Sequence, residues 1–391
     1  MSDRRRHPQP PPPPEPEGDF VLQRASEILD EIDRSTALLE EILAESAPDR
    51  RWLVEEQPRF RALMLCDLIF EKSRAAGFTD PATALDLAEL GVLISDRLDT
   101  GHYGERLVED ARARAWGHLA NAFRIASDLR RAEEALGTAE EHHRQAGEDA
   151  YTGAEILSFK ASLLNAQGRY DEAAALLDPV AHMYREARDA HREGRTLIQK
   201  AAAVSYAGRH AEAIRLARRG LAKIDIFEEP RLLIAGRHNL IASLRGSGQH
   251  KEALKALSET RGLYLQLGER SPLVRLRWLE GKILRDLGRL DEAEAALREV
   301  KTELVELRLG LDAALASLDL AMVFLEQGEA GEIKRLAAEM IAVFESREDH
   351  QRAMAAFLLF QRAAEAEQVT LALLQEVVSS LEQAQRSTER G

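Results

Sequence analysis

One short motif recurs five times in this chain at intervals of 40 residues and decides the fold: GRYDEA at 168–173, GRHAEA at 208–213, GQHKEA at 248–253, GRLDEA at 288–293 and GEAGEI at 328–333. An earlier and weaker copy, SDLRRAEEA, places Ser127 at the glycine position. A fixed period in this range is typical of a solenoid, in which each repeat is one supersecondary unit that stacks on the next.

A helical stretch precedes each motif and carries a small residue followed, three positions later, by a larger apolar one. The small residues are Ala120, Ala161, Ala201, Gly281 and Ala321, and the larger ones are Phe123, Leu164, Val204, Leu244, Leu284 and Phe324. A small side chain lets two helices approach closely, and the glycine permits the left-handed conformation that ends the first helix. The acidic residue that follows suits the N-terminus of a second helix. Each repeat is therefore predicted to be a helix–turn–helix hairpin.

Proline positions predict where several helices begin. The expected starts are Pro81 after an Asp80 cap, Pro230, and Pro272 after a Ser271 cap. Proline is tolerated in the first turn, where its missing N–H is not needed. Pro179 differs because it falls inside a predicted second helix, which we expect it to kink.

Composition outside the repeat predicts five segments. They are a disordered proline-rich tail (1–18), an amphipathic linker helix (19–47), a degenerate helix hairpin (48–104), the repeat array (105–348), and C-terminal capping helices with a short tail (349–391). The tail favours polyproline II, which has no internal hydrogen bonds and cannot join a core. It serves either as a spacer or as a ligand of a domain that binds proline-rich segments.

The linker helix has an apolar stripe with two alternative uses. The stripe recurs at helical spacing, with Thr36 in the one gap, and consists of Leu22, Ala25, Leu29, Ile32, Leu39 and Leu43. The stripe either packs on the following hairpin or pairs with a second copy of the chain through residues 20–45. Three heptads are too few to establish a coiled coil.

Charge and composition exclude several classes of protein. The chain has 391 residues, 53 Lys plus Arg and 67 Asp plus Glu, which gives a formal net charge of −14. An acidic chain repels a phosphate backbone, so nucleic acid is not the expected partner. The N-terminus lacks the apolar core of a signal peptide, and no apolar run is long enough to span a membrane. We expect a soluble, cytoplasmic protein.

Residues at the start of the array match a known repeat. Trp116, Leu119, Ala120 and Phe123 follow the W-x2-L-G-x2-Y opening of the tetratricopeptide repeat, with alanine for glycine and phenylalanine for tyrosine. The chain resembles this family over roughly residues 105–345. The resemblance implies an all-α, right-handed superhelical solenoid of about eight antiparallel helix hairpins. Residues 59–110 look like bacterial regulatory proteins that end in such arrays, but the zinc-finger or DNA-binding module of those proteins is missing.

Motifs for catalysis or metal binding are absent from the sequence. It contains no G-x-G-x-x-G, G-x-S-x-G, H-E-x-x-H or phosphate-loop motif, and Gly281-Lys282 is followed by Ile283. Cys66 lies in an apolar run and is expected to be a buried, inert thiol. Adjacent histidines diverge around a helix, so His142 and His143 do not favour one metal. We therefore expect no catalytic residue, no metal, no cofactor and no enzymatic activity.

The tetratricopeptide resemblance places the first helix of each hairpin on the concave face. The inward residues that it implies are Arg114, Asn121, Arg124, Asn165, Gln199, Tyr206, His238, Asn239, Arg245, Trp278, Lys282 and Arg285. This set has five cations and no carboxylate, so it predicts a positive groove. Basic and amide donors in a curved trough suit an extended acidic peptide.

Two functions are consistent with this pattern. The first is a non-enzymatic scaffold that binds an extended or helical acidic segment of a partner protein in the groove. The second is a sensory or regulatory arm of a bacterial signalling or transcription-control system, which acts through a separate output module.

Overall fold

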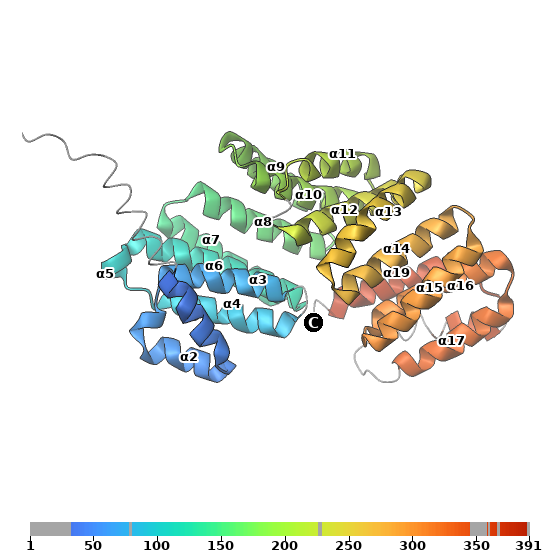
Figure 1. Cartoon of the computed structure of the whole chain (residues 1–391), viewed down its shortest axis with the longest axis horizontal. Helices are drawn as coiled ribbons and strands as arrows, with labels where there is room; N and C mark the ends of the chain where they lie inside the picture. Colours follow the sequence, from blue (N-terminus) through green and yellow to red (C-terminus); the bar gives the residue numbers. More distant parts are fainter. Residues whose placement is uncertain are drawn as a thin grey trace, which may run out of the picture.

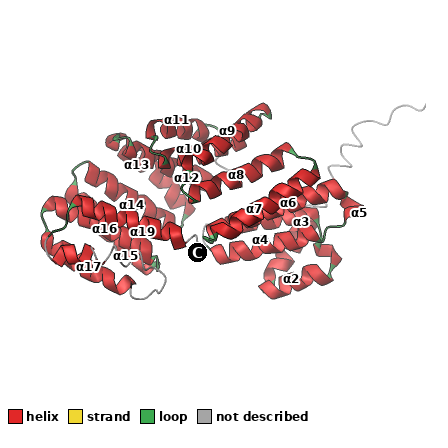
Figure 2. Ribbon diagram, turned by 180° about the vertical axis from the view of Figure 1, so that it is seen from behind, coloured by secondary structure: helices red, strands yellow, loops and turns green. Residues whose placement is uncertain are grey.

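The computed structural model describes residues 33–77, 80–225, 229–344, 358, 360–365 and 368–388, and the predictions for 1–32 and for most of 345–367 lie outside these residues. Within the described residues the chain is helical and contains no strand (Figure 2). No helix in this part of the chain is long and apolar enough to cross a bilayer. The prediction of an all-α fold is confirmed.

Seven helix hairpins follow one another around an arch in the described part of the chain, as Figure 1 shows. They pair α3 (Leu63–Ala76) with α4 (Pro81–Asp96), α6 (Glu105–Ile125) with α7 (Leu129–Ala146), α8 (Ala150–Ala166) with α9 (Tyr170–Glu186), α10 (Ala190–Tyr206) with α11 (His210–Leu221), α12 (Pro230–Gly246) with α13 (His250–Leu267), α14 (Arg270–Asp286) with α15 (Leu290–Glu306), and α16 (Gly310–Gln327) with α17 (Ala330–Phe344).

Shorter elements lie at both ends of this series. Helical residues 33–44, α2 (Ala47–Glu56), the 3-10 turn η1 (Pro58–Phe60) and α5 (Thr100–Tyr103) accompany the first hairpin. Helical residues 360–365 and α19 (Leu371–Thr388) follow the last one, and α19 packs against α16. The architecture is a solenoid of antiparallel hairpins, as predicted.

The turn glycines adopt the conformation that the motif requires. Gly168, Gly208, Gly248 and Gly288 have φ between 73° and 79°, and Ser127 has φ 69° at the equivalent position. The residue after each turn donates its N–H across the end of the first helix, as Gln249 does to the carbonyl of Leu244 at 2.9 Å. These bonds satisfy carbonyls that the helix end leaves open.

Packing between the helices follows the predicted small and large positions. Ala120, Ala161, Ala201, Gly281 and Ala321 are buried, as are the six larger residues three positions later. A Cβ added to Gly281 would lie 2.8 Å from Cγ of Leu297, so α14 and α15 approach as closely as a glycine allows. Small side chains therefore set the spacing inside the hairpins.

Several boundary predictions can be compared with the helices. Asp80 caps α4 by accepting from the N–H groups of Ala82 and Thr83, and Pro230 begins α12. The predicted Ser271 cap is wrong, because α14 begins at Arg270 and Ser271 lies within its first turn. The helix α9 continues on both sides of Pro179.

The apolar stripe of residues 33–44 packs on the same chain. Ser35, Leu39 and Ile42 are buried, whereas Thr36 is exposed. The buried face of this helix is therefore rotated slightly about the helix axis, by about one residue, relative to the predicted stripe. Leu39 and Ile42 join the hydrophobic core of the first two hairpins, so this face is not open to a second copy.

The N-terminal hairpin also meets a much later part of the array. Arg231 at the start of α12 donates from one guanidinium nitrogen to the carbonyl of Ala75 at 3.1 Å. These residues are 156 positions apart in sequence. The superhelix is therefore curved enough to bring α3 and α12 together across its inner side.

Candidate functional site

Two adjoining cavities open along the inner side of the superhelix and share Ser162. We call the one of about 520 Å³ the amide cavity and the one of about 550 Å³ the aromatic cavity, and the two together the channel. Ten of the twelve predicted groove residues line them. The amide cavity has Arg114, Asn121, Gln199 and Asn239, and the aromatic cavity has Arg124, Asn165, Tyr206, His238, Trp278 and Lys282.

The remaining two predicted residues, Arg245 and Arg285, line neither cavity. Nε of Arg245 lies 2.6 Å from Oδ2 of Asp286, and Arg285 contacts both Asp286 and Glu326. Their guanidinium groups thus take part in ion pairs between neighbouring first helices.

Amide groups from four successive first helices face the channel. Oδ1 of Asn121 accepts two hydrogen bonds from Arg124, at 3.1 and 2.9 Å. Nε2 of Gln199 donates to the carbonyl of Ser158 at 2.6 Å and to the hydroxyl of Ser162 at 2.8 Å. Oδ1 of Asn165 is buried and accepts no hydrogen bond among the described residues. A buried oxygen without a donor is costly, so this atom is a ready acceptor for a bound N–H group.

Aromatic rings form one wall of the aromatic cavity. Tyr170 and Tyr206 are stacked with their ring centres 5.5 Å apart, although the side chain of Tyr206 is 65% exposed. Nε1 of Trp278 donates to Oδ2 of Asp319 at 2.7 Å, and Nζ of Lys282 lies 3.1 Å from the same oxygen. Nζ of Lys282 also sits 5.3 Å from the Trp278 ring centre. Buried Asp319 therefore fixes the Trp278 and Lys282 side chains together.

His238 is a neutral member of this wall. Burial, reinforced by the nearby Arg275, lowers the pKa of His238 to about 4. Its Nδ1 lies 3.3 Å from the hydroxyl of Tyr264. At neutral pH this ring is a hydrogen-bonding group without charge.

A third cavity of about 530 Å³ adjoins the amide cavity and is bounded by α3, α6, α8 and α10. Arg114 lies here between two carboxylates, with one guanidinium nitrogen 2.7 Å from Asp67 and another 3.8 Å from Glu155. Burial acts to raise the pKa of Glu155, but His118 and Arg114 outweigh it and lower the pKa to about 2. Burial raises the pKa of Asp67 despite Arg114.

The expectation of a positive groove without carboxylates is wrong. Asp110, Glu155 and Glu229 line the amide cavity, and Asp312 and Glu382 line the aromatic one. Four of the five predicted cations pair with a carboxylate, and Arg124 bonds Asn121. The channel has mixed charge.

A spacing rule could have revealed several of the carboxylates that pair with predicted groove residues. Arg114 and Glu155, Arg245 and Asp286, and Trp278 and Asp319 are each 41 residues apart. On adjacent first helices, therefore, the side chain at position i+41, which is one 40-residue repeat and one further residue along, lies beside the side chain at position i. The family pattern marks the inward positions of each first helix but carries no information on this offset between neighbouring repeats.

Other predicted features are buried away from the channel or paired elsewhere. Cys66 is buried, and burial raises the pKa of its thiol well above the usual range. Nδ1 of His142 lies 2.6 Å from Glu109. The described residues contain no group of three His, Cys, Asp or Glu side chains placed to hold a metal ion.

No family model matches the sequence, and no curated protein sequence matches it significantly. Solved structures share its fold. A Rap protein complexed with Competence and Sporulation Factor has a TM-score of 0.60 and 13% identity over 84% of this chain and 89% of that chain. The apo form of the quorum sensor NprR from B. thuringiensis has a TM-score of 0.58 and 15% identity over 83% and 94%. The apo form of RapI has a TM-score of 0.55 and 11% identity over 84% and 99%. At these identities the likeness establishes the tetratricopeptide-like helical-repeat fold.

Proposed function

We propose that the channel binds an extended peptide segment, so that the chain is a non-enzymatic protein-interaction scaffold. The observation that carries this proposal is the series of amide side chains on four successive first helices. A side-chain amide has one acceptor oxygen and two N–H donors, the groups that pair with the alternating C=O and N–H groups of an extended backbone. In this structure Nε2 of Gln199 and Oδ1 of Asn121 already bond neighbouring residues, so these two amides would have to exchange those bonds or use their other atom. The members of the series are Asn121, Asn165, Gln199 and Asn239.

Further details support a peptide as the ligand. The orphaned Oδ1 of Asn165 would accept a backbone N–H, and the Tyr170–Tyr206 pair would stack on a planar or apolar side chain. Trp278 is held rigidly and provides an anchor of the kind that dominates binding energy.

The charge of the ligand follows from the lining. An acidic segment was expected because five cations were thought to be unopposed. Most of them are neutralised by neighbouring carboxylates, so we infer a segment that carries charges of both signs or few charges. Its positive groups would lie near Asp110 or Asp312.

A regulatory arm is the second candidate function, and the structural neighbours favour it. One of them is described as complexed with Competence and Sporulation Factor, and another as a quorum sensor. By analogy, peptide binding to this chain would control a separate output protein in a bacterial regulatory system.

The peptide proposal is tested by selecting binders from a random peptide display library on the intact chain. The affinity of a selected peptide is then measured by fluorescence anisotropy. Asn165→Ala combined with Asn239→Ala should weaken binding about tenfold or more, because two backbone-bonding amides are lost. Gln145→Ala, which removes an exposed amide on α7, is the matched control. Equal affinity for both variants would exclude the amide series as the site.

Self-association is measured separately. Deleting residues 1–47 would remove buried Ile42 from the core, so a variant that lacks residues 1–32 is used instead. If sedimentation shows that the full chain is dimeric and the truncated chain monomeric with peptide binding retained, the regulatory arm is favoured. If both are monomeric, dimerisation through residues 20–45 is excluded.

A further inference from the structure

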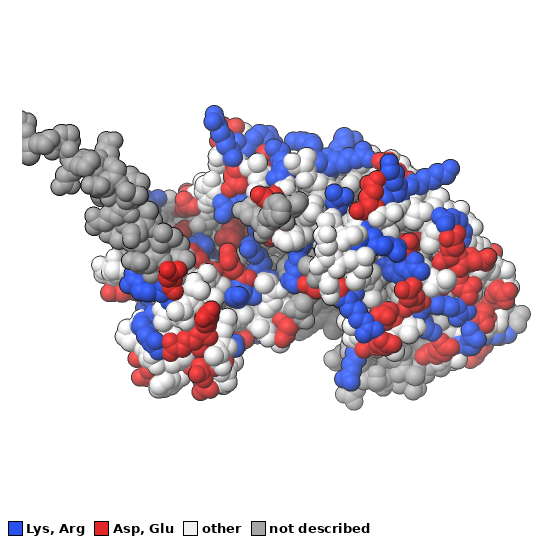
Figure 3. Space-filling model, viewed as in Figure 1, with Lys and Arg blue, Asp and Glu red and all other residues white. Residues whose placement is uncertain are grey.

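The outer face of the array carries a patch of exposed cations on α11 and α13. The two helices are neighbours, since the guanidinium of Arg218 on α11 pairs with Glu252 on α13. Lys and Arg atoms gather along this edge of the molecule in Figure 3. We call the patch the outer basic patch. Its members are Arg215, Arg218, Arg219, Lys251 and Lys255, all exposed.

The repeat does not require cations at these positions. The positions equivalent to Arg219 one and two repeats later are occupied by Glu259 and Glu299. The position equivalent to Lys251 in the next repeat is occupied by Asp291. Because the same place in the fold accepts either sign, the cations of α11 and α13 do not serve the packing of the hairpins.

Three members of the outer basic patch have no counter-charge within the part of the chain that the structure describes. Arg215, Arg219 and Lys251 pair with no carboxylate among the described residues. This differs from the channel, where Arg114 and Lys282 are held in ion pairs. Arg215 and Arg219 stand one helical turn apart, so both guanidinium groups face outward on the same side of α11.

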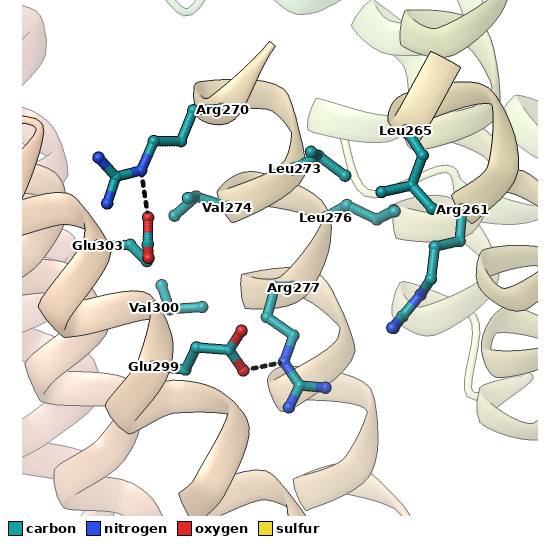
Figure 4. Close-up of a pocket in the computed structure, with 10 residues that line it drawn as sticks. All are labelled: Arg261, Leu265, Arg270, Leu273, Val274, Leu276, Arg277, Glu299, Val300 and Glu303. Atoms are coloured by element: carbon teal, nitrogen blue, oxygen red, sulfur yellow. Dashed lines mark hydrogen bonds and ion pairs between the residues drawn. The ribbon is translucent and has the colours of Figure 1, made fainter. Parts of the chain in front are cut away.

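A cleft of about 500 Å³ lies at the other end of α13, between α13, α14 and α15, and apolar side chains line it together with charged ones such as Arg277 and Glu299. Figure 4 shows Leu273 and Leu276 of α14 pointing towards Leu265 of α13. Leu265 is 62% exposed, so its side chain is accessible to a partner. Lys255 and Leu265 are both exposed on α13, and the helix rises about 15 Å between them, so the patch and the cleft lie along the exposed side of this helix.

We propose that this outer surface docks an acidic face of a partner protein, with one apolar side chain of the partner entering the cleft. An apolar anchor surrounded by charged groups is the usual anatomy of a protein–protein contact. The unpaired cations supply the charge complementarity. The surface is built from second helices and from the outer side of α14, so a partner here leaves the channel open.

Nucleic acid fits this surface less well. Glu252 and Glu259 stand among the cations with 47% and 58% of their side chains exposed. They would repel a continuous phosphate backbone, whereas a protein surface can place Lys or Arg opposite them. The net charge of −14 opposes nucleic acid further.

The test uses a labelled helical peptide with glutamates at i,i+4 spacing and one leucine on the same face. Fluorescence anisotropy with the intact chain at low ionic strength gives its affinity. Arg215→Glu with Arg219→Glu should weaken binding about tenfold. Arg130→Glu with Arg144→Glu is the matched control, because it reverses two exposed cations of the outer helix α7. Leu265→Ser should also weaken binding.

The place at which the peptide binds is located by carbodiimide coupling, which joins the peptide glutamates to nearby lysines of the chain. We expect amide links to Lys251 and Lys255. Coupling confined to Lys282, or equal affinity in the α11 and α7 variants, would overturn the proposal. The proposal would also be overturned if duplex DNA bound more tightly than the peptide and lost affinity in the α11 variant.

Discussion

The indole N–H of Trp278 donates to Oδ2 of Asp319, which lies 41 residues later on the next first helix, at 2.7 Å. Nζ of Lys282 approaches the same oxygen at 3.1 Å. One buried carboxylate thus fixes the largest aromatic side chain and one cation of the aromatic cavity. Because it also joins α14 to α16, this contact links the stability of the array to the shape of the proposed binding surface.

Asp319→Ala should lower the free energy of unfolding by about 2 kcal/mol, because a buried N–H and an ammonium group lose their acceptor. Urea unfolding followed by circular dichroism measures the change. Glu134→Ala, which breaks an exposed pair with Arg130, should cost less than about 0.5 kcal/mol. Equal losses in the two variants would show that Asp319 is not an anchor.

Gly281→Ala should destabilise the chain by about 2 kcal/mol, since the new Cβ would lie 2.8 Å from Leu297 Cγ and force α14 and α15 apart. Gly137→Ala is the matched substitution on α7, where a Cβ meets nothing within 4 Å. It should stabilise the chain by about 0.5–1 kcal/mol through helix propensity. Midpoints of urea unfolding should therefore move in opposite directions, and a shift in the same direction would contradict the packing argument.

Ser127→Gly should stabilise the chain by up to about 1 kcal/mol, because Ser127 adopts φ 69° at a position where later repeats have glycine. Gly208→Ser should have the opposite effect by about the same amount, since Gly208 has φ 79°. Thermal unfolding of the two variants gives the comparison. A neutral result for both would mean that the turn conformation carries no strain.

Stability should fall as the pH drops from 7 to 5 because of His238. Its pKa is about 4 in the folded chain and near 6.5 in the unfolded chain, so the unfolded state binds the extra proton in this range. The expected loss is about 2 kcal/mol between pH 7 and pH 5. His238→Asn should flatten this part of the curve in urea titrations at each pH. An unchanged slope in the variant would assign the effect to other groups.

Arg245→Glu with Arg285→Glu should destabilise the array by about 2–3 kcal/mol, because both guanidinium groups pair with the largely buried Asp286. Reversing these charges thus tests an internal ion-pair network, although the sequence alone placed them in the groove. Arg130→Glu on α7 is the exposed control. Urea midpoints that coincide for the two proteins would refute this role.

The hairpin fold was predictable because its determinants are local. A glycine at φ near 75° and a small residue at each helix contact recur every 40 residues, and both can be recognised from residue type and spacing. Helix starts were partly predictable for the same reason. Asp80 is a cap, but Ser271 is not, because α14 begins two residues earlier than predicted, with Glu269 at the N-cap position.

The candidate site was predictable in its residues but not in its charge. Ten of the twelve projected residues line the channel, since the first helix of each hairpin faces inward. The carboxylates Glu155, Asp286 and Asp319 were not projected. Their pairing with residues of the preceding repeat depends on the curvature of the superhelix.

The sequence by itself determined the helix hairpins, their period and the residues that let them pack, because these depend on backbone conformation and on contacts within a repeat. Tertiary structure decided the contacts between repeats and across the superhelix. It placed Asp319 against Trp278 and Arg231 against the carbonyl of Ala75. The contact of Asp319 with Trp278 exists only once two neighbouring hairpins have stacked. A small rotation from each repeat to the next accumulates over the array, so the contact of Arg231 with Ala75 needs several stacked hairpins.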